Sequence, residues 1–344
     1  MRVLIAPDCY GDSLTAVEAA EAIARGWRRG RPDDELTLAP QSDGGPGFVG
    51  VLAGRVGEVK TLRVSGPLTD EVSADWVLDP AQPRTAYIEC AQACGLALLG
   101  GPPTVQTALA AHSRGVGQLI AAAVAAGAGR IVVGLGGSSC TDGGRDMIEE
   151  LAAHARSRNE SSLAAARKLL ADVELIAATD VEHPLLGPMG AAAVFGPQKG
   201  ADEKTIARLE RRLDELAATF ERDPRGVAAT GAAGGLSGGL YGAFGARLVP
   251  GAAYVLDTIG FDDSMRAAAF VVTGEGGLDF QTLQGKIVGE VATRCRQAGV
   301  TCHAVVGRND LEPFQERILD LASVTEAGTI AQLEAAGRTL GAGD

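Results

Sequence analysis

Two short acidic glycine loops are the first candidates for chemistry in this sequence. Asp43 and Asp142 each precede a pair of glycines and each follow an apolar segment. Glycines let backbone N–H groups approach an anion, and a neighbouring carboxylate can hold Mg²⁺ or accept a hydroxyl proton. We therefore interpret Asp43 and Asp142 as metal ligands or as bases that orient a hydroxyl. Asp-Gly-Gly is also a common turn, so other loops must support this interpretation.

A glycine-rich stretch at residues 134–139 follows a β-branched run and offers amides to a phosphate. Its spacing differs from G-x-G-x-x-G, which disfavours a dinucleotide-binding oxidoreductase. Ser138 can cap a following helix, and a helix N-terminus attracts anions. We therefore expect Gly136, Gly137 and Ser138 to face phosphate. No G-x-x-x-x-G-K-[ST] string occurs, so a nucleotide would be held without a P-loop.

Lysines are rare, and two of the five lie beside glycines. Lys199 precedes one glycine and Lys286 follows another, and a lysine on such a loop is suited to contact phosphate. Glu275 and Asp279 lie in a third acidic glycine loop at residues 273–279. Three such loops on one chain favour a site for a phosphorylated ligand.

Composition excludes several classes of protein. The chain has 344 residues, 46% of them hydrophobic, and a formal net charge of −12, which disfavours nucleic acid as a partner. The six cysteines include no C-x-x-C pair and the four histidines form no metal motif, so we expect neither structural zinc nor a disulfide framework. The first apolar run is too short for a signal peptide, and no long uncharged apolar run follows. We expect a cytoplasmic protein without a membrane partner.

Several short apolar runs end abruptly in Gly, Asp or Ser. Runs without polar alternation are typical of strands buried on both faces, as in a parallel sheet. Helical stretches separate them, and Thr15 and Glu18 have the spacing of a capping box ahead of a pattern that reaches Trp27. This alternation favours an α/β fold with polar residues at the carboxyl ends of the strands. The runs are residues 3–6, 36–39, 131–133, 175–178, 270–272 and 304–306.

The pattern changes between about residues 58 and 95, where strand candidates follow one another too closely for helices. Gly-Pro and Asp-Pro turns separate them, so we expect antiparallel structure in a second domain. Stretches at 152–171 and 201–224 are typical of solvent-exposed helices, and Pro224 marks a break at the end of the second.

A series of motifs resembles, in order, the bacterial glycerate kinase family. The most specific are Gly-Pro-Gln-Lys-Gly at 196–200 and Thr-Gly-Glu-Gly with the Leu-Asp, Gln-Thr-Leu and Gly-Lys that follow it. The resemblance covers nearly the whole chain. The motifs are residues 6–8, 13–16, 43–45, 136–138, 142–144, 180–187, 193–200, 231–236 and 273–286.

The resemblance implies a flavodoxin-like parallel-sheet domain formed by both chain ends, residues 1–60 and 265–344. A second, mixed-sheet α/β domain at 61–264 is inserted between them, with the active site in the cleft. The implied reaction is transfer of a phosphoryl group from ATP, with Mg²⁺, to a small hydroxy acid such as D-glycerate, and 2-phosphoglycerate is the favoured product. A homodimer is compatible with the sequence.

The matching motifs also imply roles for individual residues. We expect Asp8 to join Asp43 and Asp142 as catalytic carboxylates, with Asp43 and Asp142 on the metal. Arg114 is our candidate to clamp the carboxylate of the acid, because a guanidinium binds carboxylate in a bidentate manner. Phosphate and nucleotide contacts are expected from Gly136, Gly137, Ser138, Lys199, Glu275, Asp279 and Lys286, and acid contacts from Ser13, Gly44, Gly45 and Asp180.

Two positions depart from the usual pattern of the family. Gly11 stands where the family usually has lysine, with Asp12 next to it, and Pro46 stands where it usually has glutamate. Both changes alter charge in loops expected to bind substrate. They leave open a paralogue that acts on another hydroxy or sugar acid, or one that binds a metabolite without efficient transfer.

Overall fold

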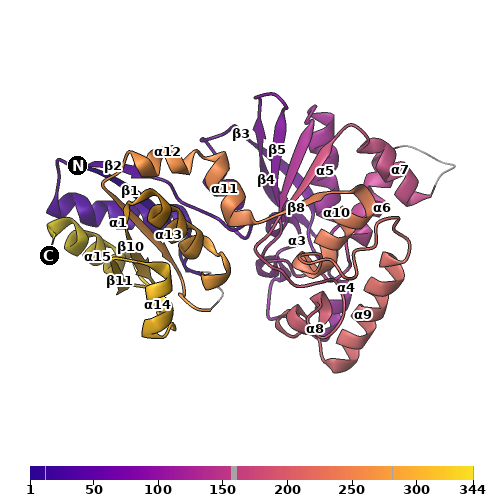
Figure 1. Ribbon diagram of the computed structural model, residues 1–344. Coiled ribbons are helices and arrows are strands. Elements are labelled where there is room, and N and C mark those ends of the chain that lie inside the picture. The colour runs from indigo at the N-terminus through magenta and orange to yellow at the C-terminus, as the bar shows by residue number, and fades with distance from the viewer. Residues whose placement is uncertain (12, 156–160, 281, 344) are drawn as a thin grey trace. The chain divides into compact units, whose positions relative to one another are not determined.

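The structure, a computed structural model, describes residues 1–11, 13–155, 161–280 and 282–343. The chain divides into two compact units (Figure 1). Unit 1 combines Met1–Asp43 with Gly251–Asp344, and unit 2 is Gly44–Pro250. Both boundaries lie earlier in the chain than the expected boundaries at 60/61 and 264/265. The first is earlier because α2 (Phe48–Leu52) packs on the strands of unit 2. The second is earlier because α11 (Gly251–Thr258) and α12 (Phe261–Arg266) pack in unit 1.

Unit 1 contains the expected parallel sheet, with strand order β11-β10-β9-β1-β2. Numbered along the unit, this order is 2-1-3-4-5, the order of flavodoxin-like folds. Every neighbouring pair is parallel. The strands are β1 (Arg2–Pro7), β2 (Glu35–Leu38), β9 (Phe270–Glu275), β10 (Thr301–Val306) and β11 (Ser323–Glu326).

Helices cover both faces of this sheet, which is why its strands lack polar alternation. Val3 and Ile5 belong to the core formed with α1 (Ala16–Gly30) and α15 (Ile330–Ala342), which lie side by side (Figure 1). Leu4 and Ala6 belong to the core formed with α11, α12 and α13 (Ile287–Ala298) on the other face. The remaining helical elements are α14 (Pro313–Leu319) and the short 3₁₀ turn η4 (Thr282–Gln284).

The capping box expected at Thr15 and Glu18 is confirmed. The Thr15 hydroxyl accepts from the Glu18 N–H at 3.2 Å, and the Glu18 carboxylate accepts from the Thr15 N–H at 2.9 Å. These bonds satisfy two N–H groups that a helix start leaves unpaired. They fix the start of α1, the helix that follows β1.

Unit 2 contains a six-stranded mixed sheet of order β3-β4-β5-β6-β7-β8. Its first three strands are antiparallel and the remaining pairs are parallel, as the close spacing between residues 58 and 95 predicts. The strands are β3 (Glu58–Ser65), β4 (Glu71–Asp79), β5 (Thr85–Glu89), β6 (Arg130–Gly134), β7 (Glu174–Ala178) and β8 (Arg247–Val249).

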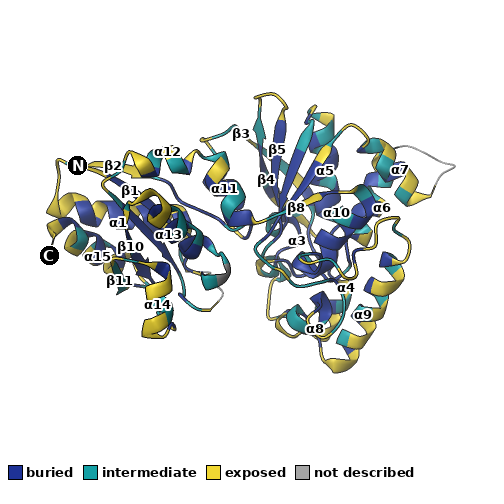
Figure 2. Ribbon diagram, in the orientation of Figure 1, coloured by how far each residue is buried: buried dark blue, intermediate teal, exposed yellow. Residues whose placement is uncertain are grey.

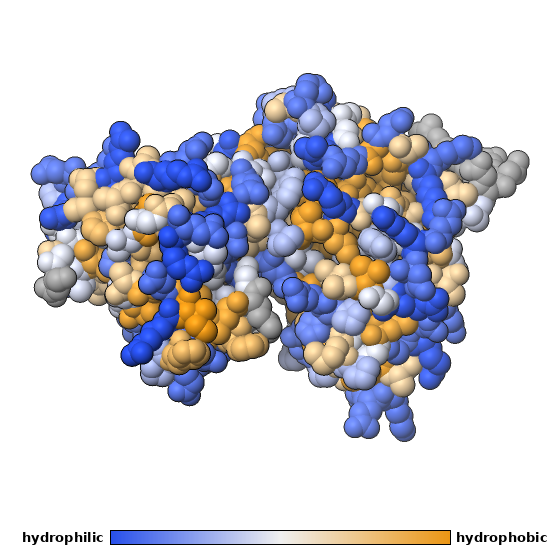
Figure 3. Space-filling view, in the orientation of Figure 1, coloured by the Kyte–Doolittle hydropathy of each residue, from blue (hydrophilic) through white to orange (hydrophobic). Residues whose placement is uncertain are grey.

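Helices α5, α6 and α10 pack on this sheet through small and aliphatic residues, and the central strands β5, β6 and β7 are its most buried part (Figure 2). Helices α4, α8 and α9 form a separate apolar cluster. In α9, Leu209, Leu213 and Ala217 face the interior, and the outer side is hydrophilic (Figure 3). The helices are α2, α3 (Ala91–Cys94), η1 (Leu96–Leu99), α4 (Val105–Ala110), α5 (Arg114–Ala125), α6 (Arg145–His154), α7 (Ser162–Leu169), α8 (Ala191–Phe195), η2 (Pro197–Lys199), α9 (Glu203–Ala217), η3 (Ala232–Gly235) and α10 (Leu236–Phe244).

The two exposed helical stretches expected from composition differ in outcome. The stretch 152–171 is divided between the end of α6 and α7, and residues 156–160 lie outside the described part of the chain. The stretch 201–224 forms α9, which ends at Ala217, before Pro224. Among the described residues, no helix has the length and apolar character needed to cross a bilayer.

Candidate active site

Unit 1 has a pocket of about 420 Å³ at the carboxyl ends of β1 and β9. In a sheet of order 2-1-3-4-5, the order reverses between these two strands, and ligands of such folds bind at this point. The pocket gathers the acids and the lysine that the sequence predicts for this unit, together with Arg308. Its lining includes Asp8, Asp43, Glu275, Asp279, Lys286 and Arg308.

The carboxylates of this pocket are close enough to shift the pKa values of one another. Burial, followed by the charges of Asp43 and Glu275, raises the pKa of Asp8 well above its usual range, although the Cys9 N–H donates to its Oδ1 at 2.7 Å. Burial also raises the pKa of Glu275 to about 7, against the lowering effects of the Thr282 hydroxyl and Lys286. The pocket therefore has more negative charge than its own cations neutralise.

The walls of the pocket are held by hydrogen bonds between strands and loops. The Thr282 hydroxyl donates to Glu275 Oε1 at 2.6 Å, which links η4 to the end of β9. The buried Tyr10 hydroxyl donates to the Val305 carbonyl, which ties the loop after β1 to β10. Lys286 is the residue before the first turn of α13. The acids and the lysine thus lie on positions that the sheet fixes.

In unit 2, the glycine loop after β6 packs against the Asp-Gly-Gly loop that opens the unit. A Cβ at Gly136 would lie 2.4 Å from Gly45 Cα, and one at Gly137, whose φ is +67°, would lie 2.7 Å from Pro46 Cγ. Glycine is therefore required at both positions. Among the described residues, the N–H groups of residues 136–138 find no hydrogen-bond acceptor, so they are available to bind an anion.

Lys199 supports this loop from inside. Its ammonium is buried and donates to Ser138 Oγ at 3.0 Å and to the Cys140 carbonyl at 2.7 Å. Burial lowers the pKa of the Lys199 ammonium. We expected Lys199 to contact phosphate itself, but its ammonium already contacts two groups of the loop. Its effect on a ligand would pass through Ser138.

Asp142 joins the starts of two helices. Its Oδ2 accepts from the Ser113 N–H at 2.9 Å and from the Ser113 hydroxyl at 2.7 Å, and its Oδ1 accepts from the Gly144 N–H at 3.1 Å. Ser113 precedes α5 and Gly144 precedes α6. The carboxylate is therefore held in one orientation by the fold.

Arg114 lies outside the small pocket that Asp142 lines. Its guanidinium contacts Asp146 Oδ2 at 3.3 Å and Glu150 Oε2 at 3.9 Å, both on α6. That pocket has a volume of about 220 Å³ and contains other cationic or titratable side chains. They are His112, Arg145 and Arg212.

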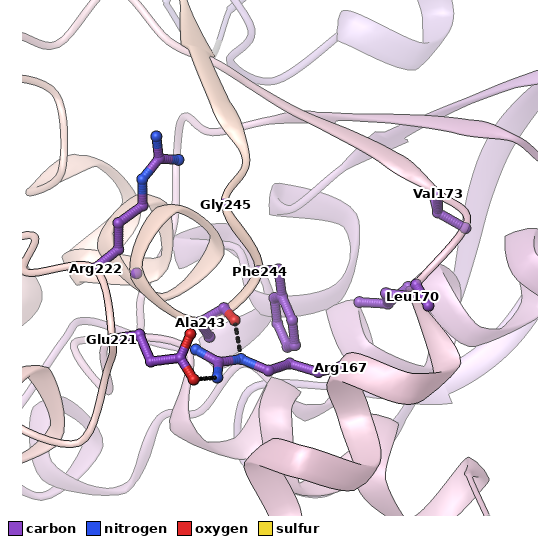
Figure 4. Close-up of a pocket in the computed structure, with 10 residues that line it drawn as sticks. Arg167, Leu170, Val173, Glu221, Arg222, Ala243, Phe244 and Gly245 are labelled. Atoms are coloured by element: carbon purple, nitrogen blue, oxygen red, sulfur yellow. Dashed lines mark hydrogen bonds and ion pairs between the residues drawn. The ribbon is translucent and has the colours of Figure 1, made fainter.

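A third pocket, of about 470 Å³, lies between α7 and α10 of unit 2. Figure 4 shows Arg167 and Glu221 pointing toward one another there, and their ion pair measures 2.6 Å. Arg167 also donates to the Ala243 carbonyl at 2.7 Å. Its central charges thus have protein partners, and none of the residues predicted for the site lines it.

Comparison with known proteins identifies the family. A family model described as the glycerate kinase family matches residues 3–337. The chain belongs to the glycerate kinase family. As a member of this family the chain is a kinase, which implies the use of ATP.

Named glycerate kinases resemble the chain over most of its length. A glycerate kinase of Halalkalibacterium halodurans is 37% identical over 325 residues, 89% of this chain and 85% of that one. A glycerate 2-kinase of Escherichia coli is 35% identical over 307 residues, 83% of this chain and 80% of that one. A solved structure described as a glycerate kinase 2 from Salmonella typhimurium LT2 has a TM-score of 0.79 at 30% identity and covers 99% of this chain and 97% of that one.

A more similar protein has no stated activity. An uncharacterised protein of Mycobacterium bovis is 56% identical over 340 residues, 98% of this chain and 84% of that one. The comparisons therefore assign the glycerate kinase family without assigning the acid that this chain phosphorylates.

Within each unit, the structure brings together part of the predicted glycerate kinase site. Unit 1 groups four predicted acids and one predicted lysine in one pocket: Asp8, Asp43, Glu275, Asp279 and Lys286. Ser13, by contrast, is exposed, and its hydroxyl donates to the Tyr10 carbonyl at 2.6 Å. Asp12 lies outside the described residues. In unit 2, a Cβ at Gly44 would lie 2.6 Å from the Ala178 carbonyl oxygen, so the loop lies against the end of β7, and Asp180 follows that end.

Sequence reasoning missed Arg308 in unit 1 and His112, Arg145 and Arg212 in unit 2. Arg308 follows the apolar run of β10, so the rule that polar residues at strand ends form the site would have found it. Arg212 lies within a charged helix that the sequence marks as solvent-exposed. Nothing in its local pattern separates it from its neighbours.

Proposed function

We propose that this chain transfers the γ-phosphoryl group of ATP to D-glycerate and forms 2-phosphoglycerate. The observation that carries the proposal is the group of buried carboxylates at the ends of β1 and β9, beside Lys286 and Arg308. The choice of product is supported by the similarity to the Escherichia coli glycerate 2-kinase.

Phosphoryl transfer needs positioning and charge neutralisation more than covalent help from the protein. In this proposal, Lys286 contacts the phosphates from the start of α13, and the free amides of Gly136, Gly137 and Ser138 bind phosphate oxygens. Lys199 holds Ser138 in place. Asp142, held by Ser113, orients the hydroxyl of the acid.

The residues of the unit 1 pocket fit Mg²⁺. Asp8, Asp43 and Glu275 are carboxylates whose mutual repulsion a divalent cation would relieve. No group of three or more metal-binding side chains is preformed among the described residues. Mg²⁺ commonly uses one or two carboxylates and completes its shell with water and nucleotide phosphates. When bound, the ion would neutralise the charge of the phosphates, and Asp8 and Asp43 are our candidates to hold it.

A second function remains as the alternative: a paralogue that phosphorylates a different small hydroxy or sugar acid, or that binds a metabolite without efficient transfer. Gly11 and Pro46 favour it, because each replaces a charged residue that the family usually has. Gly11 lines the unit 1 pocket, and Pro46 lies against Gly137.

A coupled assay of ADP release separates these functions. The purified chain is given ATP and, in turn, D-glycerate, L-glycerate, glycolate, lactate and tartronate, each with Mg²⁺ and with excess chelator. We expect turnover with D-glycerate that requires Mg²⁺. Faster turnover with another acid would assign that acid, and ATP consumption with none of them would favour the non-catalytic paralogue.

A further inference from the structure

The small pocket of unit 2 contains two buried polar side chains that lack partners. His112 is 8% exposed, and both of its ring nitrogens are buried with no hydrogen-bond partner among the described residues. The hydroxyl of Thr141, 2% exposed, is in the same condition. Both residues line the pocket. Buried polar groups are nearly always paired, so these two indicate a ligand that completes their hydrogen bonds.

Two arginines bring positive charge to the pocket. Arg145 and Arg212 both line it. Burial lowers the pKa of Arg212, and the positive charges of Arg208 and Arg145 lower it further against the opposing charge of Glu215, so these cations are near one another. Arg212 donates to the Leu109 carbonyl at 3.3 Å. In the described part of the chain, Arg145 forms neither an ion pair nor a side-chain hydrogen bond. Among the described residues neither guanidinium forms an ion pair, and adjacent guanidinium groups of this kind are suited to bind an anion.

Carboxylates also line the pocket. Asp142 and Asp146 line it, and Asp142 is fixed by Ser113 and Gly144. Asp146 contacts Arg114, which is not part of the pocket lining. Carboxylates accept hydrogen bonds and repel anions. A ligand that suits the whole pocket therefore carries an anionic group for the arginines and hydroxyl groups for the carboxylates.

Size restricts the ligand further. The volume is about 220 Å³, below the 300–1,000 Å³ or so that is typical of sites for drug-sized molecules. A nucleotide would not be enclosed here, whereas a three- or four-carbon acid would.

We propose that this pocket binds the hydroxy-acid substrate. Its carboxylate lies between Arg145 and Arg212, and its hydroxyl groups bond with His112, Thr141 and Asp142. This assignment rests on the proposed function and names the site of its acceptor. Arg145 and Arg212 take the role that the sequence assigned to Arg114, whose guanidinium is paired with two carboxylates of α6.

The test is direct binding without ATP, so that no step of phosphoryl transfer affects the result. Isothermal calorimetry would measure the dissociation constants of D-glycerate, L-glycerate, lactate and glycerol for the wild type and for Arg212→Gln, Arg145→Gln and His112→Gln. Arg211→Gln is the control, because it removes the same charge from the exposed side of α9 and does not line the pocket. ATP affinity and the unfolding midpoint are measured for each variant.

We expect glycerate to bind the wild type and glycerol, which lacks the carboxylate, to bind far more weakly. Arg212→Gln and Arg145→Gln should each weaken acid binding by roughly 10- to 100-fold, the range for loss of a charge-assisted contact. His112→Gln should weaken it less, and Arg211→Gln should leave it unchanged. ATP affinity should be the same in all four variants.

The outcomes separate this proposal from the proposed function. If acid binding depends on Arg145 and Arg212 but the chain does not consume ATP, the pocket is the acid site and the kinase reaction is rejected. If glycerate is turned over and the folded Arg145→Gln and Arg212→Gln variants bind the acid as the wild type does, the pocket is not the acid site and the kinase reaction is retained. Failure of the wild type to bind any of the acids would also overturn the pocket.

Discussion

Lys199 Nζ donates a hydrogen bond of 3.0 Å to Ser138 Oγ in the interior of unit 2. The same ammonium donates to the Cys140 carbonyl, so one buried charge holds two nearby points at the end of the glycine loop. A charge is costly to bury, and it is retained here with hydrogen bonds to two loop atoms. The relationship indicates that Lys199 shapes the loop that presents the amides of residues 136–138.

Replacing this lysine should therefore affect both stability and nucleotide binding. In Lys199→Met, the Cys140 carbonyl is left buried without its donor, which should lower the free energy of unfolding by about 1–3 kcal/mol. The KM for ATP should rise because the loop loses its support. Lys204→Met, which removes an exposed lysine, should change neither quantity. Urea unfolding and steady-state kinetics test this, and a Lys199→Met protein with wild-type values of both would reject the supporting role.

Glu275 should make stability depend on pH. Its folded pKa of about 7 is above the usual 4.5, so between these values the folded state holds a proton that the unfolded state has lost. Its stabilising contribution is complete below about pH 4.5 and is lost as the pH rises through 7. Glu275→Gln lacks this loss and keeps the acceptor for Thr282. At pH 8 the variant should be more stable than the wild type by up to about 3 kcal/mol.

Urea unfolding of both proteins at pH 5 and pH 8 measures this difference. Glu21→Gln, at an exposed position of α1, is the control and should follow the wild type at both pH values. If the difference in stability between Glu275→Gln and the wild type is the same at pH 5 and pH 8, the pKa of the Glu275 carboxyl is not raised in the folded protein.

Packing of the two glycine loops gives a steric prediction. An alanine Cβ at position 136 would lie 2.4 Å from Gly45 Cα, and no side-chain rotation can separate these two atoms. Gly136→Ala should lower stability by about 1–3 kcal/mol and raise the KM for ATP. Gly101→Ala, where the new Cβ would meet nothing within 4 Å, should change stability by less than about 0.5 kcal/mol. Equal effects of the two substitutions would contradict the close packing.

Lys286 should act on the nucleotide and not on the acid. Lys286→Gln removes a cation from the unit 1 pocket, so we expect the KM for ATP to rise by roughly 10-fold or more, while the KM for glycerate changes by less than about 2-fold. Lys204→Gln provides a variant with the same change of charge outside the pocket. Equal increases in the KM values for ATP and for glycerate would show that Lys286 does not act specifically on the nucleotide.

Much of this fold can be predicted from the sequence because its signals are local. Uniform apolar runs mark strands covered on both faces, and the carboxyl ends of parallel strands meet at one edge of a sheet. For this reason Asp8 and Glu275, 267 residues apart in the sequence, can be expected at one site. In the structure, both residues line the same pocket.

The remaining features depend on packing between segments that are distant in the sequence. Lys199 is surrounded by buried residues only because η2 packs near the loop after β6, and its Gly-Pro-Gln-Lys-Gly context looks like an exposed phosphate loop. Arg114 meets α6 through the packing of α5 on α6. The pocket of His112, Arg145 and Arg212 uses three separate segments, and no spacing within the sequence links them.

Phosphorus NMR of the product tests the chemical identity of the reaction most directly. The purified chain is incubated with D-glycerate, ATP and Mg²⁺, and the spectrum is compared with those of authentic 2-phosphoglycerate and 3-phosphoglycerate. We predict that ATP is consumed and that the new resonance is that of 2-phosphoglycerate. Accumulation of 3-phosphoglycerate, or unchanged glycerate and ATP with a folded protein, would contradict the account.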